Sequence, residues 1–194
     1  MRRPTLLLAA LAVLAGCGGS SGPAYIGSLP PEGIHLPSFS LRDYRGGLVT
    51  SKSLAGRAVA ITFLDTECRE ACPVIAQQAG RARLLLTAEE RSETAVYAVT
   101  VDPRLDTPAT VRAFLRRQHA EGALGYLLGT TRQLRPVWRA FAVLPAIDTG
   151  KAAVHSAPVR IYARDGTWVS TLAPTVDLTA RSLAHDLREA LKES

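Results

Sequence analysis

The clearest feature of the hydrophobic pattern is an apolar run that ends abruptly in polar residues. Ala58 to Phe63 reads AVAITF, which has the length and β-branched content of a strand buried on both faces. Two cysteines, Cys68 and Cys72, follow within LDTECREACP, and Pro73 comes directly after the second. Proline fits the first helical turn, where its missing N–H costs nothing. The pattern therefore predicts a buried strand that delivers two thiols to the start of a helix.

The segments around this run alternate between strand-like and helix-like patterns. A turn-rich insert, RDYRGG, lies between the short strand-like segments 39–41 and 48–50 and indicates a small hairpin. Thr107 precedes Pro108 where a helical period begins, so we expect Thr107 to cap that helix. Further strands are expected at 94–101, 124–128, 159–162 and 168–172, and helices at 73–86, 108–119, 131–141 and 178–191.

This order of elements predicts an α/β fold. Strand, helix, strand and helix, followed by a hairpin and a terminal helix, imply a mixed central sheet with helices on both faces and an N-terminal hairpin. The order is that of a thioredoxin-like fold, in which Cys68 and Cys72 follow the first central strand. No linker or internal repeat divides residues 38–194, so we expect them to form one domain.

Residues 1–17 have the pattern of a bacterial lipoprotein signal peptide. A basic start is followed by the apolar stretch TLLLAALAVLAG, which is too short for a permanent membrane span, and LAGC looks like a lipobox. This pattern predicts cleavage before Cys17 and lipid attachment to its sulfur; an ordinary signal peptide that contains a cysteine is the alternative. Residues 18–37, rich in Gly, Ser and Pro, are expected to be a flexible tether. The domain is then lipid-anchored at the outer face of the cytoplasmic membrane.

Charge argues against a nucleic-acid partner. The chain carries a formal net charge of +6, and loss of Arg2 and Arg3 with the signal peptide leaves +4. The basic residues are spread through the expected helices and interleaved with Glu and Asp. Nothing resembles a basic stripe with stacking aromatic side chains, which a nucleic-acid surface requires.

Cys68 and Cys72 are the only cysteines of the expected domain. An exported protein meets an oxidising compartment, where a cysteine pair is by default a structural disulfide. Closing so short a loop stabilises a fold by only about 2 kcal/mol, so a disulfide between these two cysteines would contribute little to stability. A helix N-terminus favours thiolate over thiol, and Arg69 acts in the same direction. We therefore expect thiolate chemistry, either redox exchange through a Cys68–Cys72 disulfide or metal binding.

Three segments resemble the Sco/SenC family of thioredoxin-like copper proteins, which assist assembly of cytochrome c oxidase. FLDTECREACP looks like the family motif T-x-C-x-x-x-C-P, matched at residues 66–73. VTVDPRLDTP looks like V-D-P-x-x-D-T-P, matched at residues 101–108. AVHSAPVRIYARDG resembles the region of the family's third ligand, here His155. The three motifs occur in the family order, and the resemblance covers most of the chain from Phe39 onward.

The resemblance implies that Cys68, Cys72 and His155 bind a copper ion. Two thiolates and one imidazole also suit copper on chemical grounds, particularly Cu(I), whereas a closed structural zinc site normally needs four ligands. The implied function is that of a membrane-anchored metallochaperone that passes copper to the copper-bearing subunit of cytochrome c oxidase. An upstream copper donor or a thiol reductant is a further implied partner. The other histidines, His35, His119 and His185, are not expected to be ligands.

The chain departs from the family at two places near these ligands. Family members commonly carry an acidic residue before the ligand histidine, where this chain has Val154. They often have proline and aspartate between the cysteines, where this chain has Arg69, Glu70 and Ala71. Neither change removes a ligand, but a lost carboxylate alters how the histidine ring is oriented. Both changes bear on delivery to an oxidase more than on metal binding.

Four acidic residues lie near the motifs without an assigned ligand role. Asp102 and Asp106 suit turns, one at the end of a strand and one before a helix cap, so we expect them to be structural. Asp65 and Glu67 lie just before the first cysteine and are expected either to tune the site or to contact a partner.

Other functions are compatible with the same residues. The first alternative is a thiol–disulfide oxidoreductase acting on the oxidase copper-site cysteines or on other exported proteins, in which one cysteine attacks and the other resolves. Dedicated thiol–disulfide oxidoreductases carry the motif C-x-x-C, which is one residue shorter than the spacing here. Their reaction does not require His155. A surface lipoprotein that uses the fold only for interaction predicts no functional effect of replacing Cys68 or Cys72. A peroxidase is disfavoured because its motif has a single peroxidatic cysteine in a different pattern.

Overall fold

The computed structural model describes residues 24–144 and 157–193. Within these ranges seven strands form one sheet, in the order β2-β1-β5-β4-β3-β6-β7. The strands are β1 Ser40–Asp43, β2 Leu48–Thr50, β3 Ala58–Leu64, β4 Thr94–Thr100, β5 Gly125–Leu128, β6 Val159–Tyr162 and β7 Trp168–Leu172. The helices are α1 Ala71–Leu85, α2 Ala88–Glu93, α3 Pro108–Arg117, α4 Thr131–Ala140 and α6 Ala180–Lys192, with a short 3-10 helix η1 Ser51–Leu54.

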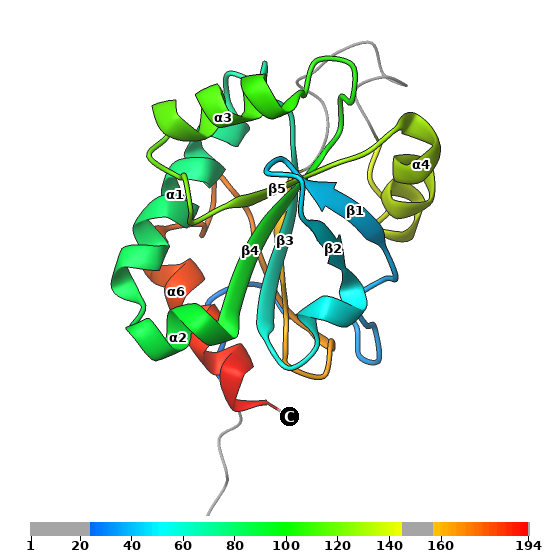
Figure 1. Ribbon diagram of the computed structural model, residues 1–194. Coiled ribbons are helices and arrows are strands. Elements are labelled where there is room, and N and C mark those ends of the chain that lie inside the picture. Colours follow the sequence, from blue (N-terminus) through cyan, green and yellow to red (C-terminus); the bar gives the residue numbers. More distant parts are fainter. Residues whose placement is uncertain (1–23, 145–156, 194) are drawn as a thin grey trace, which may run out of the picture.

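The sheet is mixed, as the alternation of elements predicts. Strand β3 pairs in parallel with β4, and β4 in parallel with β5. The hairpin β1–β2 joins the edge beyond β5, and the hairpin β6–β7 lies antiparallel to the other side of β3. Every residue of β3 is buried, which confirms the apolar run as a central strand. The carboxyl ends of β3 and β4 therefore meet at one edge of the sheet, at the top of Figure 1.

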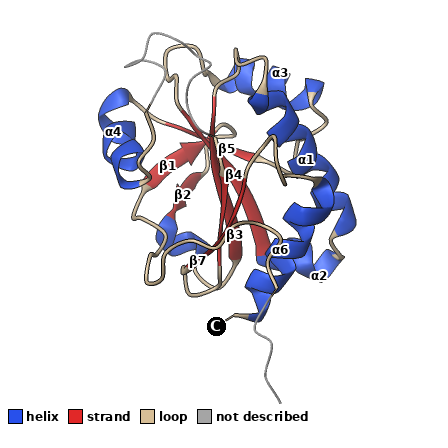
Figure 2. Cartoon of the chain, turned by 180° about the vertical axis from the view of Figure 1, so that it is seen from behind, coloured by secondary structure: helices blue, strands red, loops and turns tan. Residues whose placement is uncertain are grey.

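Helices cover both faces of the sheet (Figures 1 and 2). On one face α1, α3 and α6 bury Ile75, Phe114 and Leu187 in one apolar cluster. On the other face α4 buries Leu134 and Trp138 in a second cluster. This arrangement confirms the expected fold class and leaves the loop between β3 and α1 above the carboxyl edge of the sheet.

Threonine side chains cap the N-termini of four of the α-helices. Thr87, Thr107, Thr130 and Thr179 each accept a hydrogen bond from the backbone N–H three residues on, which satisfies one of the free donors of the first turn. Thr107 with Pro108 is the cap that the sequence predicts. Helix α2 was not expected, because it buries none of its residues and so has no apolar stripe to reveal it.

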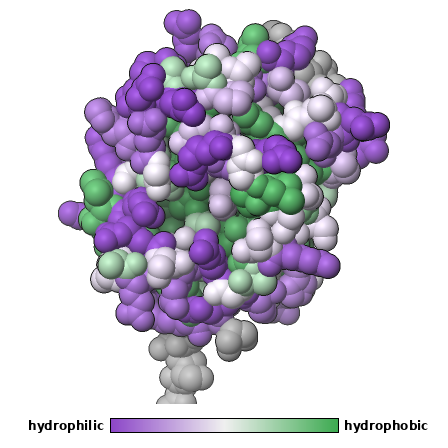
Figure 3. Space-filling model, viewed as in Figure 1, coloured by the Kyte–Doolittle hydropathy of each residue, from purple (hydrophilic) through white to green (hydrophobic). Residues whose placement is uncertain are grey.

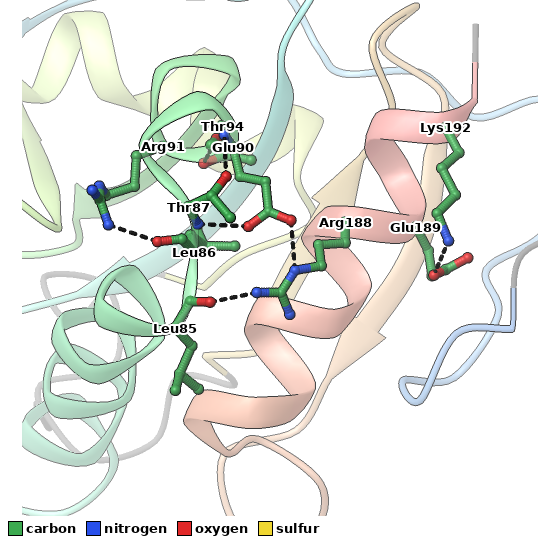
Figure 4. A network of polar contacts seen from close by, with 9 residues as sticks. All are labelled: Leu85, Leu86, Thr87, Glu90, Arg91, Thr94, Arg188, Glu189 and Lys192. Atoms are coloured by element: carbon green, nitrogen blue, oxygen red, sulfur yellow. Dashed lines mark hydrogen bonds and ion pairs between the residues drawn. The ribbon is translucent and has the colours of Figure 1, made fainter.

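Arg188 of α6 ties the region between α1 and α2 to the C-terminal helix (Figure 4). Its Nε lies 2.7 Å from Oε1 of Glu90, and its Nη2 donates to the carbonyl of Leu85. The other carboxylate oxygen of Glu90 accepts from the backbone N–H of Thr87 at 2.7 Å. The hydrogen bond to Arg188 lowers the pKa of Glu90, with the Thr87 bonds acting in the same direction. One guanidinium thus fastens α1, α2 and α6 together.

Residues 24–37 belong to the folded unit, and the prediction that they form part of a flexible tether was wrong. The backbone N–H groups of Ile26 and Gly27 donate to the buried carboxylate of Asp186 at 2.9 and 3.0 Å. Ser28 forms a backbone bridge with Thr171 of β7. The composition of this segment indicates a tether, but its order comes from backbone pairing with β7 and from hydrogen bonds to the Asp186 side chain of α6, which composition does not reveal. The rest of the expected tether, residues 18–23, lies outside the described residues.

The surface seen in Figure 3 is mostly hydrophilic or intermediate, with small groups of apolar side chains between. Leu48 and Leu84 are among the large apolar side chains exposed to solvent. Across the described residues, no helix has both the length and the apolar character needed to cross a membrane.

Candidate metal centre

The two cysteines lie in the loop that joins β3 to α1 and in the first turn of α1. Cys68 is half-buried in the loop, and Cys72 is fully buried as the second residue of the helix. Pro73 follows in the same first turn, as the sequence predicts. Glu70, which precedes the helix, makes no side-chain capping bond, so the first N–H groups of α1 are not used by a cap. They are available to a sulfur in the loop.

Three potential ligand atoms meet at this place. The two sulfurs of Cys68 and Cys72 and one carboxylate oxygen of Asp65 all lie within 4.8 Å of one another. Both thiols are free. Within the ranges 24–144 and 157–193 this is the only group of three or more Cys, His, Asp or Glu side chains arranged for a metal ion. The sequence predicts the two sulfurs, whereas the carboxylate was expected only to tune the site or contact a partner.

The two thiols differ in acidity. A hydrogen bond from the Cys72 side chain is the largest cause that lowers the pKa of Cys68, to about 6, and the backbone N–H groups of Cys72 and Glu70 act in the same direction. The same hydrogen bond, together with burial, raises the pKa of Cys72. At neutral pH Cys68 is therefore the thiolate and Cys72 the proton donor to it. The N–H groups at the helix N-terminus lower the pKa of Cys68, as expected, and the thiol of Cys72 lowers it more.

Asp65 is the first residue after β3 and holds the loop from within. It is 1% exposed, and its Oδ1 accepts from the backbone N–H groups of Glu67 and Cys68 at 3.0 and 2.5 Å. Its Oδ2 is buried and has no hydrogen-bond partner among the described residues. Burial raises the pKa of Asp65 to about 6 despite these two backbone hydrogen bonds. The sequence signal that pointed to Asp65 was its position, since it is a charged residue immediately after a buried strand.

Asp106 anchors the same loop from the side of β4. Its Oδ1 accepts from the N–H and the hydroxyl of Thr66 at 2.9 and 2.8 Å. Its Oδ2 accepts from the hydroxyls of Thr100 and Tyr126 at 2.6 and 2.8 Å. The expected structural role of Asp106 is confirmed, and so is that of Asp102, whose Oδ1 accepts from the backbone N–H of Arg104 at 3.1 Å. The link from Asp106 to the cysteine loop was not predicted.

Cys68 is reached through a cavity of about 390 Å³ between the loop and α3. Its lining residues are Thr66, Glu67, Cys68, Arg69, Pro73, Phe114, Arg117 and Gln118. A partner group or an exchanging ligand therefore has access to Cys68, whereas Cys72 is shielded beneath it.

Several predicted positions fall outside this cluster. His155, Val154 and Cys17 lie outside the described residues, so their predicted roles are untested. Of the histidines not expected to be ligands, His35 faces the Thr167 hydroxyl at 3.5 Å, and His185 contacts the carbonyl of Ala24 at 2.8 Å. Neither these two nor His119 belongs to the cysteine cluster.

The donor set fits a soft or borderline transition metal. Thiolates select copper, zinc and iron–sulfur clusters, whereas magnesium and calcium prefer sites made only of oxygen. Two close sulfurs and a buried, unpartnered oxygen therefore suit copper or zinc better than they suit a hard cation.

Comparisons with known proteins give a family profile, a relative and solved structures that are similar to this chain. The profile of the SCO1/SenC family matches residues 30–192. A putative copper-binding protein of Stutzerimonas stutzeri is 29% identical over 143 residues, which are 72% of this chain and 69% of that protein. The structure of Bradyrhizobium japonicum ScoI with copper bound has a TM-score of 0.64 and 28% identity, covering 81% of this chain and 99% of that one. A SCO1/SenC family lipoprotein from Bacillus anthracis has a TM-score of 0.70 at 19% identity, covering 84% and 98%. The likeness confirms the thioredoxin-like fold.

Proposed function

Because the chain belongs to the SCO1/SenC family, we propose that it binds a copper ion through Cys68 and Cys72, with His155 as the third protein ligand. The observation that carries the proposal is the pair of free thiols within 4.8 Å, one of them stabilised as a thiolate. Copper binding is also the property named in the relative from Stutzerimonas stutzeri and in the structure of Bradyrhizobium japonicum ScoI.

A place for His155 near the cysteines is supported by the strand that follows it. Ala157, two residues later, is buried, and its carbonyl accepts from the hydroxyl of Thr62 in β3 at 3.4 Å. Strand β6 then runs antiparallel to β3. The chain therefore enters the sheet beside the strand that leads into the cysteine loop.

The two thiols take different parts in loading. Cys68 is a thiolate at neutral pH and reaches the cavity, so it is the first ligand to meet an incoming ion. Cys72 becomes a ligand on losing its proton, because the thiolate is the metal-binding form. Loading therefore releases a proton from Cys72. A Cys68–Cys72 disulfide removes both ligands and makes binding dependent on the redox state of the pair.

We further propose that copper is cargo rather than a resident cofactor. The family resemblance supports delivery to the copper-bearing subunit of cytochrome c oxidase, and the lipobox ending in Cys17 supports a lipid anchor at the outer face of the cytoplasmic membrane. Tyr25, near the start of the described chain, donates to Glu193 at 2.7 Å, next to the C-terminal end, which Figure 1 marks at the opposite end of the domain from the carboxyl edge of β3. An anchor there leaves the cysteine loop open to a partner.

A thiol–disulfide oxidoreductase is the second candidate, favoured by the contrast between the two thiols. A half-buried thiolate at Cys68 suits nucleophilic attack on a partner disulfide, and the buried thiol of Cys72 suits resolution of the mixed disulfide. In that reaction the partner disulfide is reduced to two thiols while Cys68 and Cys72 are oxidised to a disulfide. A thiol reductant must then restore the pair.

Competition for Cu(I) between the reduced protein and a calibrated chelator tests the proposal. The wild type is expected to bind one Cu(I), and His155→Ala is expected to bind it at least about tenfold more weakly through loss of a ligand. His119→Ala, which changes an exposed histidine outside the cluster, is the matched control and is expected to bind like the wild type. Absence of Cu(I) binding by the wild type contradicts the copper proposal. Equal binding by His155→Ala contradicts the third ligand and moves the choice toward disulfide exchange.

A further inference from the structure

We propose that Asp65 is an additional metal ligand, whose Oδ2 gives the cysteine pair an oxygen donor that favours divalent over monovalent copper. The inference deepens the proposed copper function and rests on it. It concerns a residue that neither the sequence motifs nor the family resemblance assigns to the metal.

The first support is an oxygen without a partner. Asp65 is 1% exposed, and its Oδ2 is the only buried side-chain oxygen or nitrogen that lacks a hydrogen-bond partner in the part of the chain the structure describes. A buried polar atom without a partner is costly and is rare in folded proteins. A metal ion beside the two sulfurs supplies the missing partner.

The second support is the way the carboxylate is held. Its other oxygen, Oδ1, accepts from the backbone N–H groups of Glu67 and Cys68. Because the two oxygens belong to one rigid planar group, these bonds also fix Oδ2 relative to the Cys68 backbone. The resulting place of the carboxylate is within 4.8 Å of both sulfurs. A donor that is already oriented needs little reorganisation to bind an ion.

Neighbouring carboxylates differ from Asp65 in this respect. Both oxygens of Asp106 are occupied, by Thr66 on one side and by Thr100 and Tyr126 on the other. Asp102 is held by Arg104 and is not part of the sulfur cluster. Asp65 is therefore the carboxylate that has an oxygen within 4.8 Å of the sulfurs and also a buried oxygen without a partner among the described residues.

The chemical consequence is selectivity between oxidation states. Soft thiolates suit Cu(I), and a carboxylate oxygen is a harder donor better matched to a divalent ion. Removing Asp65 should therefore weaken binding of Cu(II) much more than binding of Cu(I). It should also raise the reduction potential of bound copper, because the oxidised state loses a ligand that the reduced state uses little.

The variant Asp65→Asn distinguishes the roles of the two carboxylate oxygens. Asparagine keeps an acceptor for the Glu67 and Cys68 N–H groups and replaces the other oxygen with an amide NH₂, which is not a ligand. We expect its affinity for Cu(II), measured without oxygen, to fall at least about tenfold, in the range found when ligand support is lost at metal sites. Its affinity for Cu(I) is expected to stay within about threefold, because both thiolates are retained.

Asp102→Asn is the matched control. Asp102 is also a buried aspartate after a strand, and its Oδ1 likewise accepts from the N–H two residues on, here that of Arg104. The substitution removes one nearby negative charge without touching the sulfur cluster. Its affinity for Cu(II) should stay close to that of the wild type. If Asp102→Asn weakens Cu(II) as much as Asp65→Asn does, the effect is one of charge and the ligand proposal is overturned.

Co(II), which does not oxidise thiols, tests the ligand apart from copper. Its visible absorption with the wild type should differ from that with Asp65→Asn in band position and intensity, because the donor set changes. Identical Co(II) spectra and equal Cu(II) affinities would overturn the inference while leaving copper binding intact. Failure of the wild type to bind copper would instead overturn the proposed function, and the Co(II) spectra would still decide whether Asp65 is a ligand.

A measurement on the wild type tests the proposal even if the variant Asp65→Asn fails to fold. With carboxyl-labelled aspartate, the infrared difference spectrum on adding Zn(II) should show the carboxylate stretch of one buried aspartate shifting. Absence of any such shift at full metal loading overturns the proposal.

Discussion

The carboxylate of Asp106 and the hydroxyl of Thr66 form a hydrogen bond of 2.8 Å between residues that are forty positions apart. The bond joins the loop after β4 to the loop that carries Cys68. Since Asp106 also accepts from Tyr126, the two predicted motifs meet in one buried network. The motif around Asp106, which contains no cysteine, therefore helps to hold the loop that carries Cys68 in place.

Asp106→Ala is expected to destabilise the fold and loosen the cysteine loop. It leaves the buried donors of Thr66, Thr100 and Tyr126 without an acceptor, at about 1–3 kcal/mol per group. We expect a loss of at least about 3 kcal/mol in the free energy of unfolding, measured with urea. Asp165→Ala, in an exposed turn, is the control and should change stability much less. Equal stabilities would show that the network contributes little.

The reactivity of Cys68 should depend on pH in an unusual range. Thiolate is the nucleophile, and the hydrogen bond from Cys72 lowers the pKa of Cys68 to about 6. The rate of alkylation by iodoacetamide should therefore rise through pH 6 and level off near neutrality, whereas an ordinary thiol continues to gain rate up to about pH 9. In Cys72→Ala, which removes this hydrogen bond, the midpoint should move upward. A midpoint above pH 8 in the wild type would contradict the assigned thiolate.

The Arg188 bridge in Figure 4 should contribute measurably to stability. Arg188→Ala removes the bonds to Glu90 and to the Leu85 carbonyl, and we expect a loss of about 1–2 kcal/mol in unfolding free energy, since the charge-assisted bond to Glu90 is part-buried. Lys192→Ala breaks only a surface pair with Glu189 and should cost less than about 0.5 kcal/mol. Equal effects of the two substitutions in thermal unfolding would contradict the proposed role of Arg188.

Gly27→Ala tests the attachment of residues 24–37. A Cβ at this position would lie 2.2 Å from the Ser170 hydroxyl oxygen and 2.6 Å from the Thr171 carbonyl oxygen, so the segment must shift. Overpacking of this kind costs about 1–3 kcal/mol. Gly47→Ala, which meets nothing within 4 Å, is the matched control and should be nearly neutral. If residues 24–37 were a free tether, the two variants would have the same stability and the same susceptibility to limited proteolysis.

The local patterns of the chain predict most of the fold. The run that became β3, the first-turn position of Pro73 and the cap at Thr107 all follow from local chemistry: burial on two faces, a missing N–H and a hydroxyl acceptor. Helix α2 escaped prediction because it buries no residue. The segment around Gly27 was misassigned because its composition is that of a linker while its contacts are long-range.

The candidate site was predictable only in part for the same reason. Spacing places Cys68 and Cys72 together on one loop and one helical turn, so their proximity is local. The difference in acidity between them depends on a hydrogen bond and on burial, which spacing does not determine. The unpartnered oxygen of Asp65 is likewise a property of the packed loop, because it depends on which donors the fold brings near.

The central claim is that copper is held by the two sulfurs of Cys68 and Cys72, and X-ray absorption at the copper edge of the Cu(I)-loaded protein tests it most directly. We expect two sulfur neighbours and one nitrogen neighbour in the wild type, one sulfur in Cys72→Ser, and two sulfurs without the nitrogen in His155→Ala. A first shell made only of nitrogen and oxygen, unchanged by Cys72→Ser, would contradict the account.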